Sequence, residues 1–270
     1  MLTKPRSLTL GVVFALLASL RLCVTLPVFA MAPAVPADVE RLLEKHIRAR
    51  GGLAAYQQIK VRRTVSTVKI GDQDVRTVSI EIPADGRFYQ MLENAKMGKV
   101  EVGFDGKAMW QRSPQSQGEI PLDDPRARAI RRSAVAAEFW DYKKDERQFR
   151  YGGREKMDNV EYEVLESTFT MQNGDDAPAK YYFDAAGLLR VIVAGADGAT
   201  RLEFADFRPV DGVQYPFLTK FSAPQTSVQT MVTEIRHNTP LDATVFTYKE
   251  AIRPPAPVAP PKTPPTPPKK

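Results

Sequence analysis

The sequence predicts an α+β protein that is mainly antiparallel β, with one large curved sheet and helices over one side of it. Two observations support this class. From Val61 onward, short segments rich in β-branched and aromatic residues follow one another with few interruptions. Many of them are separated by Asp-Gly or Asn-Gly pairs, which favour tight hairpin turns. Sequential strands joined by short turns pair as an antiparallel meander, and about a dozen such strands can form a single sheet.

The amino terminus has the organisation of a secretory signal peptide, predicted over residues 1–30. Lys4 and Arg6 precede an apolar run that stops at Arg21, and small residues near Ala30 offer a cleavage point. The run of 13 residues is shorter than the roughly 20 that a membrane-spanning helix needs. Export with cleavage, and therefore a periplasmic location, is favoured over an uncleaved membrane anchor.

Cys23 is the only cysteine and lies inside this segment. A bacterial lipoprotein would carry its lipid on such a cysteine, but Leu20-Arg21-Leu22 lacks the small residues expected before a lipidated cysteine. We therefore expect no lipidation of Cys23. The mature chain would contain no disulfide, which is compatible with an oxidising compartment.

After a short leader over residues 31–37, one domain is predicted over residues 38–252. Asp38 can cap a helix over residues 39–50, whose apolar residues recur along one stripe. The Gly51-Gly52 pair can end this helix, because glycine accepts the left-handed conformation of a helix C-terminus. A shorter helical turn is expected over residues 53–59.

The strands are expected at residues 61–70, 75–82, 87–92, 98–104, 107–112, 149–152, 160–170, 179–184, 188–194, 200–207, 213–221 and 227–236. One long helix interrupts them, from Pro125 to about Tyr142, because two aspartates precede a proline suited to a first helical turn. Its basic residues are candidates for contacts with lipid headgroups or a partner protein: Arg128, Arg131 and Arg132. Runs of this kind are more often a solvated helix face.

Residues 253–270 are predicted to be a disordered, extended tail, since nine of these 18 residues are proline. The alternative is a spacer whose terminal lysines touch anionic lipid or the cell wall. Of the formal net charge of +6, three positive charges lie in the signal peptide and four in this tail, which leaves the domain at −1. Nucleic-acid binding is therefore disfavoured.

The sequence contains little that indicates catalysis. His46 and His237 are its only histidines, and neither has cysteine or carboxylate neighbours at the spacing of a metal site. No nucleophile elbow, phosphate-binding loop or dinucleotide fingerprint is present. We predict no catalytic residue, metal or cofactor. A hydrolase would require two carboxylates that converge in a cleft, which a sequence cannot show.

Large apolar side chains on the predicted strands and helix are candidates for the wall of a hydrophobic cavity. They are Phe88, Met91, Phe104, Met109, Trp110, Trp140 and Phe204. A packed core uses the same residue types, so the sequence leaves both interpretations open.

Four segments in order, residues 104–114, 181–189, 204–216 and 235–246, resemble the periplasmic lipoprotein-sorting carriers, the LolA/LolB-like group. The first contains Phe-Asp-Gly-Lys followed by the tryptophan and proline of a central hairpin in these carriers. The resemblance implies an incomplete β-barrel, a half-barrel with a helical lid over a hydrophobic cavity that shields acyl chains. In these carriers an arginine before a proline helps to latch the lid, but Ile82 stands before Pro83 here.

The leading hypothesis is an exported, non-enzymatic monomer that binds acyl chains of lipoproteins or phospholipids, in outer-membrane lipoprotein sorting or a related task. Its further partners would be membrane proteins of the envelope. The alternative is an envelope interaction or sensing module that has the same fold and no lipid cargo, and a hydrolase is a third hypothesis.

Overall fold

A computed structural model describes residues 35–248, apart from Met97, Ala136, Ala137, Glu146, Gln172 and Ala196. All of these residues belong to one compact unit. The predicted signal peptide with Cys23, most of the leader and the proline-rich tail lie outside the described residues and remain predictions. Among the residues that are described, no helix is both long and apolar enough to cross a membrane.

Thirteen strands form a single antiparallel sheet, which confirms the predicted fold class. The first six are β1 (Arg62–Ile70), β2 (Gln73–Ile82), β3 (Arg87–Asn94), β4 (Gly98–Phe104), β5 (Met109–Arg112) and β6 (Gln117–Ile120). The other seven are β7 (Arg150–Met157), β8 (Val160–Thr170), β9 (Asp176–Phe183), β10 (Leu189–Ala194), β11 (Thr200–Val210), β12 (Val213–Ala223) and β13 (Thr226–His237).

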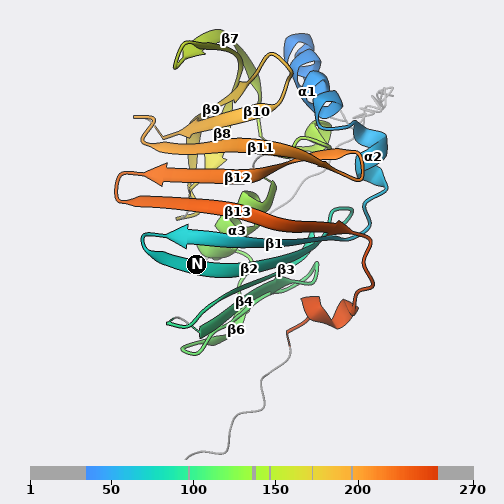
Figure 1. The fold of residues 1–270 in the computed structure, drawn as a ribbon, viewed down its shortest axis with the longest axis vertical. Coiled ribbons are helices and arrows are strands. Elements are labelled where there is room, and N and C mark those ends of the chain that lie inside the picture. Colours follow the sequence, from blue (N-terminus) through green and yellow to red (C-terminus); the bar gives the residue numbers. More distant parts are fainter. Residues whose placement is uncertain are drawn as a thin grey trace, which may run out of the picture. The chain divides into compact units, whose positions relative to one another are not determined.

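The sheet consists of two meanders joined in its middle. Its order is β6-β5-β4-β3-β2-β1-β13-β12-β11-β10-β9-β8-β7, so the chain enters at the centre and runs to the β6 edge. It then crosses to the β7 edge and returns strand by strand to the centre, where β13 pairs with β1 (Figure 1). Every connection within a meander is a hairpin, and the Asp-Gly, Asn-Gly and similar pairs of the sequence predicted several of these turns.

Helix α1 (Ala37–Ala49) covers the second meander. Val39, Leu42 and Leu43 are fully buried in one cluster with side chains of β8 to β11, as the apolar stripe predicted. The helix begins with Pro36 at its N-cap and has no side-chain capping bond, so the predicted cap by Asp38 is wrong. The short helix α2 (Leu53–Gln57) follows directly.

Helix α3 (Pro125–Val135) is shorter than predicted, and the expectation that it continues to Tyr142 is wrong. Phe139 and Trp140 lie outside it, before the 3₁₀ turn η1 (Tyr142–Lys144). Glu138, Phe139 and Trp140 are successive residues whose side chains all turn inward. A helix would spread three successive side chains over more than half of its circumference, so an irregular segment is needed to bury all of them.

The sheet curves around α3, which contacts strands from both ends of the sheet order. Ala127 packs with Phe104, Met109 and Ile120 of the first meander, a group that we call the α3 cluster together with Phe88. On its other side, α3 contacts β8. The result is the predicted half-barrel with helices over the concave side, and α3 lies behind the strands in Figure 1.

Besides η1, two short elements were not predicted. Strand β6 contains Gln117, Gly118 and Glu119, so it lacks the apolar alternation that identifies a strand. The 3₁₀ turn η2 (Ala243–Phe246) packs on the outer face of β3 and β4. There the backbone oxygen of Phe246 accepts a hydrogen bond of 2.6 Å from the indole of Trp110.

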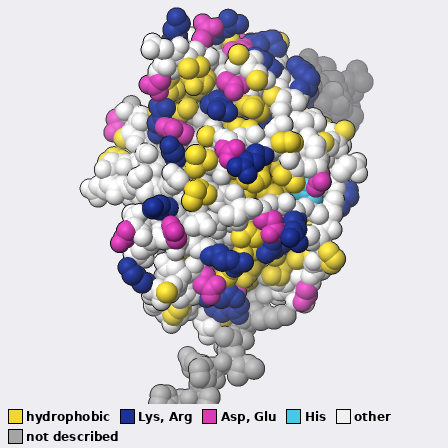
Figure 2. Space-filling view, viewed as in Figure 1, with side chains coloured by type: hydrophobic (Ala, Val, Ile, Leu, Met, Phe, Trp, Pro, Cys, Tyr) yellow, Lys and Arg dark blue, Asp and Glu magenta, His cyan; other side chains and the backbone are white. Residues whose placement is uncertain are grey.

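The outer face of the sheet carries basic and acidic side chains close together, interspersed with apolar ones (Figure 2). Examples are the ion pairs of Arg63 with Glu234 at 3.2 Å and of Arg201 with Glu203 at 2.7 Å. The mixture on this face does not create the field of one sign that a polyanion would recognise.

Candidate functional site

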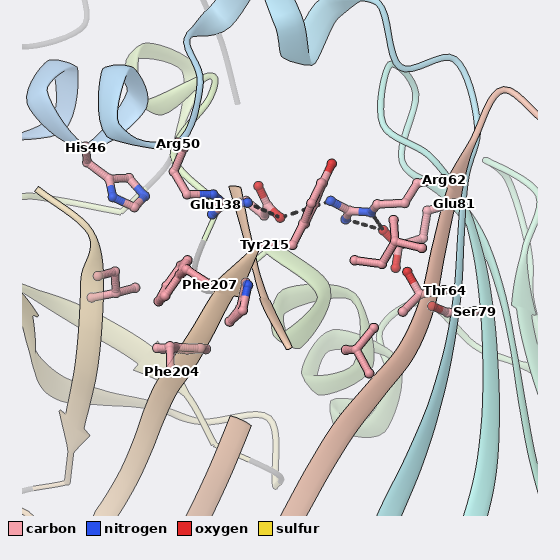
Figure 3. A pocket seen from close by; sticks show the side chains of 14 residues that line it. His46, Arg50, Arg62, Thr64, Ser79, Glu81, Glu138, Phe204, Phe207 and Tyr215 are labelled. Atoms are coloured by element: carbon pink, nitrogen blue, oxygen red, sulfur yellow. Dashed lines mark hydrogen bonds and ion pairs between the residues drawn. The ribbon is translucent and has the colours of Figure 1, made fainter. Parts of the chain in front are cut away.

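A cavity of about 240 Å³ lies on the concave side, between the end of α1, the middle of the sheet and the segment that follows α3 (Figure 3). One wall is apolar and comes mainly from the second meander. Its residues are Leu189, Phe204, Phe207, Pro216, Val232 and Ile235. Thr64 and Ser79 continue the lining onto β1 and β2. The opposite end of the cavity is charged.

The charged end consists of two arginines and two glutamates, which we call the ion cluster: Arg50, Arg62, Glu81 and Glu138. Arg62 Nη1 lies 3.3 Å from Glu138 Oε1, and its Nε donates to Glu81 Oε2 at 3.1 Å. Arg50 Nη2 lies 3.9 Å from the same oxygen of Glu138. The side chains of Arg50 and Arg62 are only 6% and 11% exposed, so these charges are largely removed from water.

Burial alone would raise the pKa of the Glu138 carboxyl, but Arg50 and Arg62 outweigh it and lower that pKa. Burial likewise opposes the charge of Arg62, while Glu81 and Glu138 raise the pKa of its guanidinium. Both groups are therefore charged at neutral pH. The cluster is an ionic network in which each charge has an opposite partner.

Aromatic rings hold the Arg50 guanidinium in place. Its central carbon lies 5.3 Å from the ring centre of Trp140 and 5.5 Å from that of Tyr215, within the range of cation–π contacts. The indole of Trp140 stacks on Tyr56 at 4.2 Å and donates to Glu138. The ring of Trp140 and the carboxylate of Glu138 thus stabilise each other's positions beside Arg50.

Tyr215 is oriented by His237, which in turn contacts Asp211. Asp211 Oδ2 lies 2.9 Å from His237 Nδ1, and His237 Nε2 lies 3.1 Å from the Tyr215 hydroxyl. Burial raises the pKa of Tyr215 and lowers the pKa of His237 against the effect of Asp211. The tyrosine therefore remains a neutral phenol at neutral pH, which suits positioning and not nucleophilic chemistry.

His46 closes the cavity beside Leu189. Its Nδ1 is 2.9 Å from the Gly187 oxygen, and its ring meets the rings of Phe139 and Phe183 edge-on. Burial, and next the charge of Arg50, lower the pKa of His46 to about 4. His46 is therefore neutral at pH 7 and packs against these rings. Within the described residues no three His, Cys, Asp or Glu side chains converge as a metal site would require.

Glu81 and Glu138 are the converging carboxylates that a hydrolase would require. Each is bound to Arg62, and the pKa of Glu138 is lowered. A carboxylic acid that protonates a leaving group needs the opposite, a raised pKa. The pair therefore does not support the hydrolase hypothesis.

No protein-family model and no curated protein matches the chain. Solved structures do match its fold. A LolA superfamily protein from Nitrosomonas europaea aligns with a TM-score of 0.55 at 15% identity, over 80% of this chain and 99% of that one. The chain has a LolA-like fold.

Two further structures agree. A DUF1329 family protein from Desulfovibrio piger has a TM-score of 0.54 at 15% identity, over 79% of this chain and 98% of that one. A domain from Vibrio parahaemolyticus described as an outer membrane lipoprotein-sorting protein has a TM-score of 0.52 at 14% identity, over 74% and 97% of the two chains. The fold implied by the sequence resemblance is therefore confirmed. At 14–15% identity, the structural similarity supports the fold alone.

The predicted cavity residues on the concave side lie in three different surroundings, and two further ones lie on the outer face. Phe204 lines the cavity. Phe88, Phe104 and Met109 belong to the α3 cluster, on the concave face but outside the cavity. Trp140 lies behind the lining, stacked on Tyr56.

Met91 and Trp110 lie on the outer face. Trp110 follows Met109 in β5, and successive residues of a strand point to opposite faces. Its indole packs beside Tyr248 and donates to the oxygen of Phe246, while Met91 pairs with Val78 and Glu101. This placement corrects the expectation that both residues face the cavity.

The three arginines proposed for headgroup contacts lie on α3 and not at the cavity. Arg128 pairs with Asp176 at 2.5 Å, and the guanidinium of Arg131 lies 5.1 Å from the ring centre of Phe104. Arg132, in the last turn of α3, is half-buried. Contact of these arginines with headgroups or partners stays a prediction.

The residues of the ion cluster were not predicted from the sequence. Arg62 and Arg63 are neighbours in β1, and nothing local distinguishes the arginine that faces inward from the one that faces outward. The alternation of Arg62, Thr64 and Ser66 is a weak signal of a polar inner face. Arg50, directly before the Gly-Gly stop of α1, has no signal of its own.

Proposed function

We propose that this protein is an exported, non-enzymatic carrier that binds the acyl chain of a lipid or lipoprotein in the cavity. The observation that carries the proposal is the wall of Phe204, Phe207, Val232 and Ile235 on the concave face of a LolA-like sheet. Each CH₂ group that leaves water contributes about 0.8 kcal/mol, so a chain of about 16 carbons offers up to ~12 kcal/mol before ordering costs.

Binding of an acyl chain requires the segment after α3 that carries Glu138, which we call the cover, to move away from the cavity. The volume of about 240 Å³ is below the roughly 300–1,000 Å³ of typical small-molecule sites. The segment that carries Glu138 is tied to the sheet through Arg62 and to the end of α1 through Arg50. Opening the cavity would separate these ion pairs. Arg62 of β1 would therefore hold the cavity closed, the role that an arginine before a proline has in the LolA/LolB-like carriers and that Ile82, before Pro83, cannot have.

The signal peptide predicted from the sequence supports a periplasmic location. The similarity to structures described as LolA superfamily and lipoprotein-sorting proteins supports a task in handling envelope lipoproteins or lipids. We propose that the carrier acts as a monomer, with envelope membrane proteins as donors or acceptors of its cargo.

The test is to purify the exported protein from its cells under native conditions and to analyse extracted lipids by mass spectrometry. A stoichiometric lipid or lipopeptide is the expected result, and its mass would identify the cargo class. A Phe204→Glu variant, which places a charge on the apolar wall, should carry much less lipid. A protein that is empty and takes up no fluorescent fatty-acid probe would contradict the proposal.

The second candidate is an interaction or sensing module with this fold and no cargo. The observation in its favour is that the cavity is small and its charged end is satisfied internally. An empty protein that fails to take up the probe, but is captured with an envelope protein by crosslinking in cells, would favour this candidate.

A further inference from the structure

The cavity combines an apolar wall with a charged end, and this combination limits which ligand fits. Phe204, Phe207 and Ile235 line one side, while Arg50 and Arg62 stand at the other (Figure 3). A purely hydrocarbon ligand would leave the charged end unused. An amphiphile with one tail would place its tail along the rings and its head at the arginines.

The two arginines keep their positions without Glu138. Arg50 Nε donates to the Gln214 oxygen at 2.5 Å, and the Arg50 oxygen accepts from Gln214 N at 2.9 Å. Its guanidinium also lies 5.5 Å from the ring centre of Tyr215 on β12, a contact that does not involve the segment that carries Glu138. Arg62 is bound by Glu81 within the sheet. Both guanidinium groups are therefore part of the fixed frame of the cavity.

Glu138 differs from both arginines in how its backbone is anchored. It lies in the irregular segment between α3 and η1, so its backbone belongs to no helix or strand. Its carboxylate is 3.9 Å from Arg50, at the long end of an ion pair, and 3.3 Å from Arg62. It also accepts a hydrogen bond from the indole of Trp140, which lies two residues further along the same segment. Of the four members of the ion cluster, Glu138 is the one that can leave without disrupting regular structure.

Departure of Glu138 would unbalance the cluster. Two guanidinium groups would then face one carboxylate, that of Glu81, and Arg50 would have no carboxylate partner within the cluster. A desolvated cation is costly unless an anion replaces the lost partner. A carboxylate reproduces the size, charge and hydrogen-bonding capacity of the group that left.

We propose that the cavity selects single-chain carboxylate amphiphiles, long-chain fatty acids, whose head replaces the Glu138 carboxylate between Arg50 and Arg62. This inference rests on the proposed function and narrows its cargo. Glu138 acts as an internal stand-in for the ligand head, which keeps the arginines paired while the cavity is empty. The tail then runs along the wall of Phe204, Phe207 and Ile235.

The test compares hexadecanoate with hexadecanol, two ligands of equal chain length that differ in the charge of the head, by calorimetric titration of the purified protein. Hexadecanoate is expected to bind at least about tenfold more tightly, the effect of one charge-assisted hydrogen bond. Glu138→Gln, which removes the competing charge, should strengthen hexadecanoate binding several-fold and leave hexadecanol binding unchanged.

Glu163→Gln is the matched control. Glu163 is also a buried carboxylate with two basic partners, Arg41 at 2.8 Å and Lys45 at 2.6 Å, but it does not line the cavity. The control should change neither affinity. Arg50→Gln should abolish the preference for the acid, and its folding is checked by circular dichroism; if it does not fold, the Glu138→Gln comparison still decides.

Equal binding of acid and alcohol, with no effect of Glu138→Gln, would overturn this inference and leave acyl-chain binding intact. Binding of neither ligand would count against the proposed function itself. Tighter binding of hexadecanol in Glu138→Gln would also overturn the inference, because it would show that the substitution only loosens the cover.

Discussion

The α3 cluster and the cavity lie on the same face of the sheet and use the same kinds of side chain, yet one is filled and the other is hollow. In the cluster, Ala127 of α3 packs directly onto Phe104 and Met109. At the cavity, Phe204 and Phe207 face the ion cluster across an open space. Buried charges must keep their partners, so the elements that carry them cannot collapse onto the apolar wall. The charges, and not the apolar residues, identify the site.

The largest effect is expected from breaking the ion cluster. Arg62→Met would leave Glu81 without its basic partner in the cluster, and would leave Glu138 with Arg50, at the longer distance, as its ion-pair partner. We expect the free energy of unfolding to fall by about 3–5 kcal/mol, measured by chemical denaturation.

The control is the adjacent arginine. Arg63 pairs with Glu234 on the outer face, where the two side chains are 30% and 33% exposed. Arg63→Met should cost no more than about 1 kcal/mol. Equal losses in the two variants would show that the ion cluster contributes no more than a surface pair.

Phe104→Ala and Phe204→Ala make the same chemical change in the α3 cluster and at the cavity. Phe104 is buried within the α3 cluster and does not line the cavity, so we expect a loss of about 3–5 kcal/mol in unfolding free energy and unchanged uptake of a fatty-acid probe. Phe204 already faces open space, so its truncation should cost about 2 kcal/mol in stability. Probe affinity of this second variant should fall about tenfold. Equal profiles of both variants would remove the distinction between cluster and cavity.

Stability near the cavity should depend on pH. The pKa of His46 is about 4 in the folded protein and 6.5 ordinarily, so the unfolded chain takes up the proton first as the pH falls. The unfolding free energy should therefore decrease by about 2 kcal/mol from pH 7 to pH 5, and His237 adds to this with the same sign.

His46→Gln should flatten the pH profile of stability, since glutamine does not titrate. The α3 cluster consists of apolar side chains, so Phe104→Ala should shift the whole profile down without changing its shape. A profile of His46→Gln with the wild-type slope would contradict the assignment to His46.

The smallest effect is expected at the pair that joins α3 to the second meander. Arg128 and Asp176 are 47% and 37% exposed, so Arg128→Ala should change the unfolding free energy by about 0.5 kcal/mol or less. A loss that is much larger and persists in high salt would show that this pair, and not the apolar contacts of Ala127, holds α3 in place.

The sequence predicted well whatever depends on neighbouring residues. Helix α1 and most strands lie within a few residues of their expected bounds, because apolar periodicity and turn residues act locally. It failed at the end of α3, where Glu138 and Trp140 leave helical geometry to reach Arg62 and Tyr56. Propensity favoured the helix, and tertiary contacts overrode it.

For the site, the predicted residue type is correct, since aromatic side chains do line the cavity, but of the seven predicted residues only Phe204 is among the lining residues that the structure describes. Phe204 lines the cavity, whereas Trp110, the residue at the centre of the recognised hairpin, packs on the outer face against η2. The alternation of side chains within β5 indicates that Met109 and Trp110 point to opposite faces of the sheet. Only the position of α3 shows which of the two faces is concave.

The antiparallel strands, the helix at the start of the domain and the resemblance to lipoprotein carriers could all be predicted from the amino-acid sequence, because strand patterns and hairpin turns are encoded in short segments. The position of the cavity could not be predicted in this way, because it depends on contacts between distant segments. Arg50, Arg62, Glu81 and Glu138 come from the end of α1, from β1, from β2 and from the segment after α3. They meet only once β1 pairs with β13 and the cover folds over the sheet, since ion pairs between distant segments leave no periodic trace in a sequence.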